Sequence, residues 1–226
     1  MTTIETNGGT YESADQIDFI DIGGSKGGSY GLIQKKYGYE NGLAIDIDPE
    51  KVKLSLDNNV PAIRLDASKM SIFSDNACKL VSIVHTLEHL PNLAVVEDVL
   101  RSALRVASDT IYIRGPMYYI DYLKPMGFQF FWSHWTGHTC LIEPDEILTM
   151  MANIALSMGL TPKNISHELS FIKSVESSSD PCIHAASGLI DRHDFDPKID
   201  PPKDQNVKFD RDIYKEFVLI FTLKKT

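Results

Sequence analysis

Residues 17–36 constrain the fold of this chain more than any other part of its sequence. Residues 17–22 form a short apolar run rich in β-branched side chains, with Asp21 near its end, and four glycines follow within residues 23–28. Glycine lets the backbone approach a ligand where a Cβ would collide, and it reaches positive φ at little cost. A strand, a glycine-rich turn and a helix in this order predict a nucleotide-like ligand at the carboxyl edge of an open parallel sheet.

The order of the glycines argues against a dinucleotide. A pyrophosphate-binding loop needs glycine at its first, third and sixth positions, and the third position here is Ser25. The better match is an acidic residue followed by small residues at alternate positions, namely Asp21, Gly23, Ser25 and Gly27. A carboxylate at the strand end suits a cationic group better than a pyrophosphate. In this pattern the chain resembles the class I S-adenosylmethionine-dependent methyltransferases, although that family usually has a glycine in place of Ser25.

The next predicted strand, over residues 42–47, also ends in carboxylates. Asp48 and Pro49 are typical of a helix N-cap and a first helical turn. An acidic residue just before them can accept hydrogen bonds from both hydroxyls of a ribose. The resemblance implies this role for Asp46, and a helix cap is the alternative.

A third strand is predicted to lead into Asp66 and Ala67. The resemblance places this pair against the adenine, where the Asp66 carboxylate would accept a hydrogen bond from the exocyclic amine. The alternative for Asp66 is again a cap at the end of a strand.

The fourth strand is expected to end at His85, just before the sequence Leu-Glu-His-Leu at 87–90. The resemblance implies that His85 lies beside the methionine part of the cofactor and faces the transferable methyl group. Glu88 and His89 follow, and they either shape the pocket or take part in acid–base chemistry. Cys78 and Lys79 depart from the aromatic–acidic pair that the family more often carries.

Alternating strands and helices predict parallel strand order with right-handed crossovers. A fifth strand is expected over 109–116, and two later strands over 161–169 and 215–223. We therefore predict an α/β fold with a Rossmann-like, doubly wound seven-stranded sheet, mostly parallel, whose last strand is antiparallel as in the resembled family. A single methyltransferase-like domain over 1–226 is expected.

Residues 117–145 are expected to form a substrate-facing insertion, because aromatic residues and histidines gather there. Such a cluster forms either ordinary core or the wall of an apolar pocket with a few polar groups. If the acceptor is a hydroxyl, a base is needed, and His134 and His138 are the candidates for this catalytic role. Their spacing also fits a zinc pair, but with Gly137 between them and no third ligand nearby in sequence we expect no metal site.

Residues 174–212 are rich in proline, serine and alternating charges, and we expect an irregular excursion between the last two strands. The segment either stays a solvated surface loop, folds over the site as a lid, or forms a subunit contact. Its acidic residues lack the spacing of a calcium-binding loop.

Composition and charge limit the partners. The formal net charge of −9 disfavours nucleic acid, whose binding depends on clustered Lys and Arg. No apolar stretch is long enough to span a bilayer, and the first residues lack a secretory pattern. Three scattered cysteines show no disulfide pattern, so we expect a cytoplasmic protein without membrane insertion, and its oligomeric state is left open.

The function that follows is methyl transfer from S-adenosylmethionine to an oxygen or nitrogen of a small molecule such as a metabolite, a sugar or a lipid-linked precursor. A non-catalytic, regulatory S-adenosylmethionine-binding protein is one alternative, and a nicotinamide-dependent oxidoreductase, which the glycine order disfavours, is the other. The residues expected to bind the cofactor are Asp21, Gly23, Gly24, Ser25, Gly27, Asp46, Ile47, Asp66, Ala67 and His85.

Overall fold

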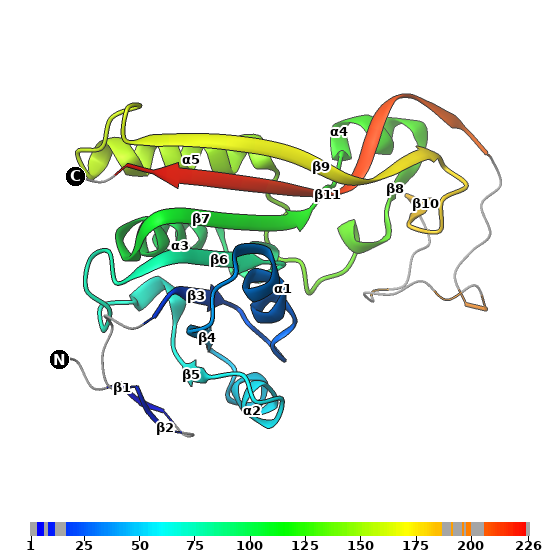
Figure 1. The fold of residues 1–226 in the computed structure, drawn as a ribbon. Coiled ribbons are helices and arrows are strands. Elements are labelled where there is room, and N and C mark those ends of the chain that lie inside the picture. The colour runs from blue at the N-terminus through cyan, green and yellow to red at the C-terminus, as the bar shows by residue number, and fades with distance from the viewer. Residues whose placement is uncertain are drawn as a thin grey trace.

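A computed structural model describes residues 4–6, 9–11, 17–186, 191, 196, 198–199 and 206–224. Its centre is a seven-stranded sheet (Figure 1). In spatial order the strands are β5 (Ala62–Arg64), β4 (Gly42–Asp46), β3 (Phe19–Ile22), β6 (Cys78–Val84), β7 (Ala107–Pro116), β11 (Lys208–Leu223) and β9 (Ile165–Ser177). The first five are parallel, and β11 is antiparallel to both β7 and β9. The predicted fold class is confirmed.

Four helices cover the two faces of the sheet. They are α1 (Gly28–Tyr37) and α2 (Pro49–Asp57) on one face and α3 (Leu93–Val106) and α5 (Pro144–Ser157) on the other. Successive side chains of a strand point to opposite faces, so Phe19 packs in one core cluster with Ile33 of α1, while Ile20 packs in the other with Leu100 of α3. The sheet therefore has a buried core on each side.

Short elements connect this framework or extend it. As predicted, Asp48 caps α2 by accepting a hydrogen bond from the Glu50 N–H at 2.9 Å. The remaining elements are β1 (Ile4–Thr6), β2 (Gly9–Tyr11), α4 (Ile120–Leu123), β8 (Phe128–Phe130), β10 (Ile183–Ala185) and the 3-10 turns η2 (Ala67–Lys69), η3 (Leu87–His89), η4 (Lys124–Met126) and η5 (Phe131–Ser133).

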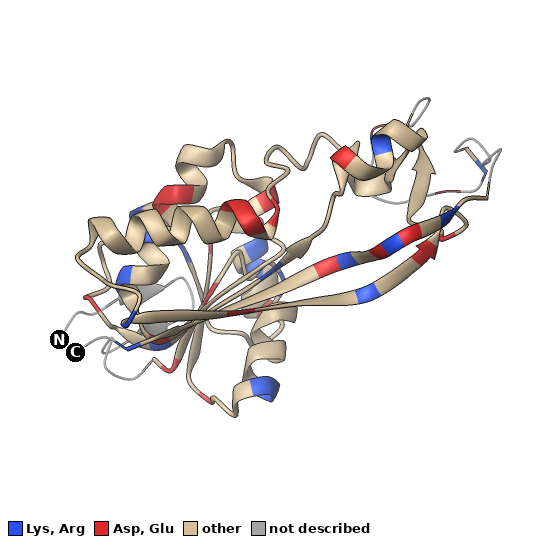
Figure 2. Cartoon of the chain, turned by 90° about the horizontal axis from the view of Figure 1, so that it is seen from above, with Lys and Arg blue, Asp and Glu red and all other residues tan. Residues whose placement is uncertain are grey.

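Strands β9 and β11 are longer than predicted and project beyond the sheet as a two-stranded ribbon (Figure 1). The strand expected over 161–169 begins at Ile165 and continues to Ser177. Both ends of the segment 174–212, predicted to be irregular, are thus β-structure, because Val175, Phe209 and Ile213 bury their side chains there. Figure 2 shows acidic and basic residues distributed along the projecting ribbon. Residues 187–190, 192–195, 197 and 200–205 of that segment lie outside the described part of the chain.

A second, two-stranded sheet joins the two segments that the sequence set apart. Strand β8, from the predicted insertion 117–145, pairs antiparallel with β10, from the segment 174–212. Phe130 and Ile183 on these strands are completely buried and belong to the same core cluster as the central sheet. We call residues 117–143 and 178–186 together the arm.

Among the helices of the described residues, the longest have 14 residues and none could span a bilayer.

The arm should contribute to global stability, because its core is continuous with that of the sheet. We predict that Phe130→Ala lowers the free energy of unfolding by about 3–5 kcal/mol, as expected when a buried aromatic side chain is removed. The matched change Phe171→Ala, at a side chain 39% exposed on β9, should cost about 1 kcal/mol or less. Urea unfolding of both variants measures the difference, and equal costs would contradict a shared core.

Candidate active site

The loop after β3 lies against the ends of two neighbouring strands with no room for side chains. Gly23 has φ +71, and a Cβ there would lie 2.3 Å from Oγ1 of Thr86, the residue that follows the end of β6 by two positions. A Cβ on Gly24 would lie 2.7 Å from the Cβ of Ala44 on β4. The Thr86 hydroxyl donates to the Ile22 carbonyl at 3.1 Å. Glycine is therefore required by close packing as well as by backbone conformation.

Ser25 stands where the resembled family usually has a glycine, and its backbone has a positive φ. Its φ is +46, in the left-handed region that side chains rarely occupy. Its N–H donates to Oδ2 of Asp46 at 3.3 Å, and its carbonyl accepts from the Ser55 hydroxyl at 2.5 Å. These bonds connect the loop to β4 and α2 and hold the unfavourable backbone conformation.

Asp21 lies beneath the loop and is fully buried. Its carboxylate accepts hydrogen bonds from the hydroxyls of Ser29, at 2.6 Å, and Ser82, at 2.7 Å. It thus joins the start of α1 to β6. Burial raises the pKa of Asp21 to about 6, although the two serine hydrogen bonds act in the opposite direction. The expected contact with a cationic ligand group would require this carboxylate to leave its serine partners.

Asp46 and Ile47 lie at the carboxyl end of β4, next to the loop. One oxygen of Asp46 accepts from the Asp48 N–H at 3.0 Å and the other from Ser25. Ile47, directly after the end of β4, leaves 62% of its surface exposed. A half-buried carboxylate beside an exposed apolar side chain suits a ribose and its attached base.

The structure shows Asp66 in its alternative role, as a cap. Its carboxylate accepts from the N–H of Ser68 at 3.0 Å and from the Ser68 hydroxyl at 2.7 Å, and it forms an ion pair with Lys69. Ala67 begins the short helix η2 and is half-buried. Both residues lie at the carboxyl end of β5, the strand next to β4. This is the edge of the sheet at which the predicted contact with adenine would form.

His85 follows β6 and lies between two acids. With φ +50, it directs Nδ1 to Oε1 of Glu88 and Nε2 to Oε2 of Glu216, both at 3.3 Å. Burial alone would lower the pKa of His85, but the hydrogen bonds to Glu216 and Glu88 outweigh it and raise the pKa to about 9. At neutral pH the imidazole is therefore a cation that donates from both nitrogens.

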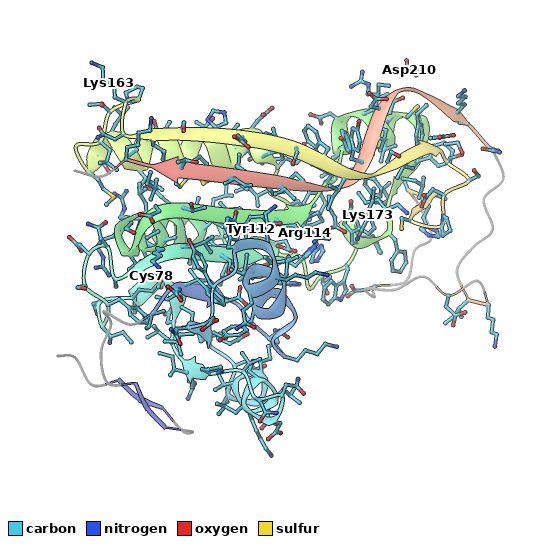
Figure 3. All side chains as sticks on the ribbon, in the orientation of Figure 1. Cys78, Tyr112, Arg114, Lys163, Lys173 and Asp210 are labelled. Carbon is cyan, nitrogen blue, oxygen red and sulfur yellow. The ribbon has the colours of Figure 1, made fainter. Side chains whose placement is uncertain are left out.

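Glu216, on β11, collects three cationic partners. Arg114 Nε donates to it at 2.5 Å, and Lys173 Nζ and His85 also donate to it. Although burial acts to raise the pKa of Glu216, these three donors hold it far below its usual value. Figure 3 labels Arg114 and Lys173 where the ribbon leaves the sheet. Sequence reasoning missed these three residues, and the available signal was a Lys-Glu pair at 215–216 directly before the apolar run of β11.

Of the two candidate bases, His138 lies at the site and His134 does not. His138 is buried and, with His85 and Glu216, lines a cavity of about 370 Å³ at the carboxyl end of the sheet. His134 is exposed in the loop after η5 and is not on this wall. The other lining residues are Glu88, His89, Pro116, Trp132, Lys173, Cys182 and Lys215. The cavity thus combines the end of β6 with residues of the arm.

Comparisons with known proteins agree with this geometry. Residues 20–110 match the family model of a methyltransferase domain, and none of the curated proteins matches the sequence. A SAM-dependent methyltransferase from Archaeoglobus fulgidus is similar in structure, with 14% identity and a TM-score of 0.59, over 91% of this chain and 86% of that one.

Two further solved structures show the same fold. One is a SAM-dependent methyltransferase from Methanosarcina mazei, with 14% identity and a TM-score of 0.54, over 92% of this chain and 93% of that one. The other is phosphoethanolamine N-methyltransferase 2 from Haemonchus contortus in complex with S-adenosyl-L-methionine. It has 12% identity and a TM-score of 0.50, over 70% of this chain and 35% of that one.

Two adjacent glycines of the loop should respond oppositely to the same substitution. Gly27 has φ +92, and a Cβ there would lie 2.6 Å from Cγ2 of Val60, whereas a Cβ on Gly28, in the first turn of α1, meets open space. We predict that Gly27→Ala lowers the free energy of unfolding by about 2 kcal/mol or more. Gly28→Ala should leave it unchanged or raise it by up to about 1 kcal/mol. Thermal and chemical unfolding test the pair, and equal behaviour would contradict the loop geometry.

The buried carboxyl of Asp21 should make stability depend on pH. Its pKa in the folded protein, about 6, lies above the 3.8 expected of the unfolded chain. As pH rises from about 4 to 6, the Asp21 carboxyl therefore ionises in the unfolded state before it ionises in the folded state. The free energy of unfolding falls by about 2–3 kcal/mol over this range. Asparagine has no carboxyl proton, so the Asp21→Asn variant should lack this loss of stability. The difference in unfolding free energy between the variant and the natural protein should shift by that amount in favour of Asn between pH 4 and 7, and parallel pH curves would refute the assignment.

Proposed function

We propose that this chain, a class I S-adenosylmethionine-dependent methyltransferase, transfers a methyl group to an oxygen or nitrogen of a small molecule. The family and the cofactor rest on the methyltransferase family model over 20–110 and on the shared fold. The residues that bind cofactor and acceptor and the class of acceptor are the proposal. The observation that carries it is a cavity of small-molecule size whose wall includes His85, the residue before Thr86, which packs against Gly23 of the glycine loop.

In the proposed arrangement the cofactor lies across the carboxyl ends of β3, β4 and β5. The backbone of the loop of Gly23, Gly24, Ser25 and Gly27 would contact the methionine part and the ribose, since the loop follows β3 and packs against the ends of β4 and β6. Asp46 would accept hydrogen bonds from the ribose hydroxyls, and the exposed Ile47 would pack against the adenine. Both follow from their positions at one strand end.

The acceptor would bind in the cavity of about 370 Å³, a volume typical of small-molecule sites. The cavity lies next in sequence to the proposed cofactor site, because His85 on the cavity wall is followed by Thr86, which packs against Gly23 of the loop. Its walls offer an indole, a cationic imidazole and two lysines next to a carboxylate. This mixture suits a polar metabolite, a sugar or a lipid-linked precursor, with apolar surface for its carbon skeleton.

The transfer itself is an in-line displacement. A lone pair of the acceptor oxygen or nitrogen forms the new bond to the methyl carbon. The carbon–sulfur bond breaks toward sulfur, which leaves S-adenosylhomocysteine, and the acceptor loses one proton to the surrounding water. The protein supplies proximity, orientation and exclusion of bulk water from the methyl group. His85 holds a positive charge at this end of β6 and positions Glu88 and Glu216.

We also place the protein in the cytoplasm, in keeping with Cys78, Cys140 and Cys182, which form no disulfide among the described residues.

Asp46→Asn should weaken cofactor binding, because the amide keeps the size of the carboxylate but loses one acceptor and its charge. We predict about a tenfold lower affinity for S-adenosylhomocysteine, measured by calorimetry. Asp57→Asn, an exposed acid at the other end of α2, serves as the matched control and should leave the affinity unchanged. NAD should bind to none of these proteins.

Incubation with tritiated S-adenosylmethionine then tests the acceptor class. Label should appear in the filtered small-molecule fraction of a cell extract and should decrease with Asp46→Asn. Label confined to the macromolecular fraction would overturn the small-molecule assignment. Cofactor binding without any labelling in either fraction would instead support a regulatory protein.

A further inference from the structure

Three potential metal ligands from two distant parts of the sequence meet on the wall of the acceptor cavity. They are Glu88 and His89 in η3 and His138 in the arm, and their ligand atoms all lie within 4.8 Å of one another. Sequence reasoning paired His138 with His134, whereas the structure leaves His134 out of the group and brings two other ligands, Glu88 and His89, next to His138. Glu88 and His138 are buried, and His89 is exposed.

The ring of His89 is held in the orientation that a metal ligand needs. Its Nδ1 donates to the Gly137 carbonyl at 2.8 Å. Because a carbonyl can only accept, the neutral ring carries its proton on Nδ1 and its lone pair on Nε2. A hydrogen bond of this kind to a backbone carbonyl fixes the tautomer of metal-binding histidines. The absence of a side chain at Gly137 lets the Trp135 ring pack closely beside it, because a Cβ there would lie 2.3 Å from Cζ2 of Trp135.

Aromatic rings hold the second histidine in place. The ring centroids of His89 and His138 are 4.9 Å apart, and Trp135 packs against both rings, at 5.5 and 5.0 Å. The Tyr118 hydroxyl lies 3.5 Å from Nδ1 of His138. An apolar shell around a polar centre limits water access and rigidifies the ligands.

Glu88 completes the set with a carboxylate. Its described hydrogen bond engages only Oε1, through Nδ1 of His85. The second oxygen is the one available for a further partner.

We propose that Glu88, His89 and His138 bind one divalent transition-metal ion. Two imidazoles and one carboxylate, with the remaining coordination positions open, are a donor set suited to Zn²⁺, Co²⁺ and their first-row neighbours rather than to Mg²⁺ or Ca²⁺, which prefer oxygen ligands. Ligand atoms around such an ion lie about 3–3.5 Å apart. Binding therefore draws the most distant pair together by about 1–2 Å, within reach of side-chain rotation.

The open positions of the ion face the acceptor cavity, since all three ligands line it. A hydroxyl or carbonyl oxygen of the acceptor can occupy one of them, which would hold the acceptor beside the methyl group. This role of the ion rests on the proposed function, but the binding of the ion does not. It also makes His138 a ligand in place of the general base expected from the sequence.

The test uses the full chain, treated with chelator and dialysed, and titrated with Co²⁺. Visible d–d absorption should appear and saturate at one equivalent, and Zn²⁺ should abolish it while the same concentration of Mg²⁺ does not. His89→Ala and His138→Ala should each weaken Co²⁺ binding at least tenfold, and Glu88→Gln should weaken it as well. His134→Ala is the matched control in the same loop, exposed and outside the cluster, and should bind Co²⁺ like the natural protein.

S-adenosylhomocysteine binding to the metal-free proteins separates the two proposals. Variants that keep a thermal shift with this ligand are folded, so their loss of Co²⁺ absorption reports on the ligands alone. Absence of saturable absorption in the natural protein, or binding unchanged in His89→Ala and His138→Ala, overturns the metal site even where S-adenosylhomocysteine binds. Co²⁺ binding at one equivalent without any S-adenosylhomocysteine binding supports the metal site and contradicts the proposed function.

Discussion

The site depends on the close approach of backbone to side chain at the carboxyl ends of β3, β4 and β6. Gly23 faces Thr86 and Gly24 faces Ala44 at distances that leave no space for a Cβ. Because the loop packs this closely against the strands, it passes directly over the sheet edge, and Asp46 connects to it by a hydrogen bond from the Ser25 N–H. The edge that results is lined by backbone on one side and by a carboxylate and an isoleucine on the other.

Much of this edge could be predicted because its information is local. A strand, a turn and a helix are adjacent in sequence, so the glycines, the position of Asp46 and the cap at Asp48 follow from nearby residues. For Asp21 and Asp66, the neighbouring sequence does not determine what the carboxylate contacts. Both occur at the predicted strand ends, but whether a carboxylate there contacts a ligand, a serine or a helix start depends on which way it turns.

The acceptor side could not be predicted in the same way because it is built from distant segments. His85 and Glu216 are 131 positions apart, and β8 and β10 pair residues of two segments that look unrelated in sequence. The length of β9 and β11 was also underestimated, since charged residues interrupt their apolar positions and mimic a loop. Only the burial of Val175, Phe209 and Ile213 reveals them as one continuous ribbon.

The projecting ribbon of β9 and β11 adds residues from the second half of the chain to the cavity wall. Residues before β7 form the edge at which we propose that the nucleoside binds, and three of them, His85, Glu88 and His89, also line the cavity. Lys173, Cys182 and Lys215 of the cavity wall come from β9, the turn beyond it and β11. One half can therefore stay fixed while the other changes in length and composition. Related chains that keep the glycine loop but differ in this hairpin would share a methyl donor and diverge in what they methylate, so selectivity in such a lineage evolves in the hairpin, away from the donor.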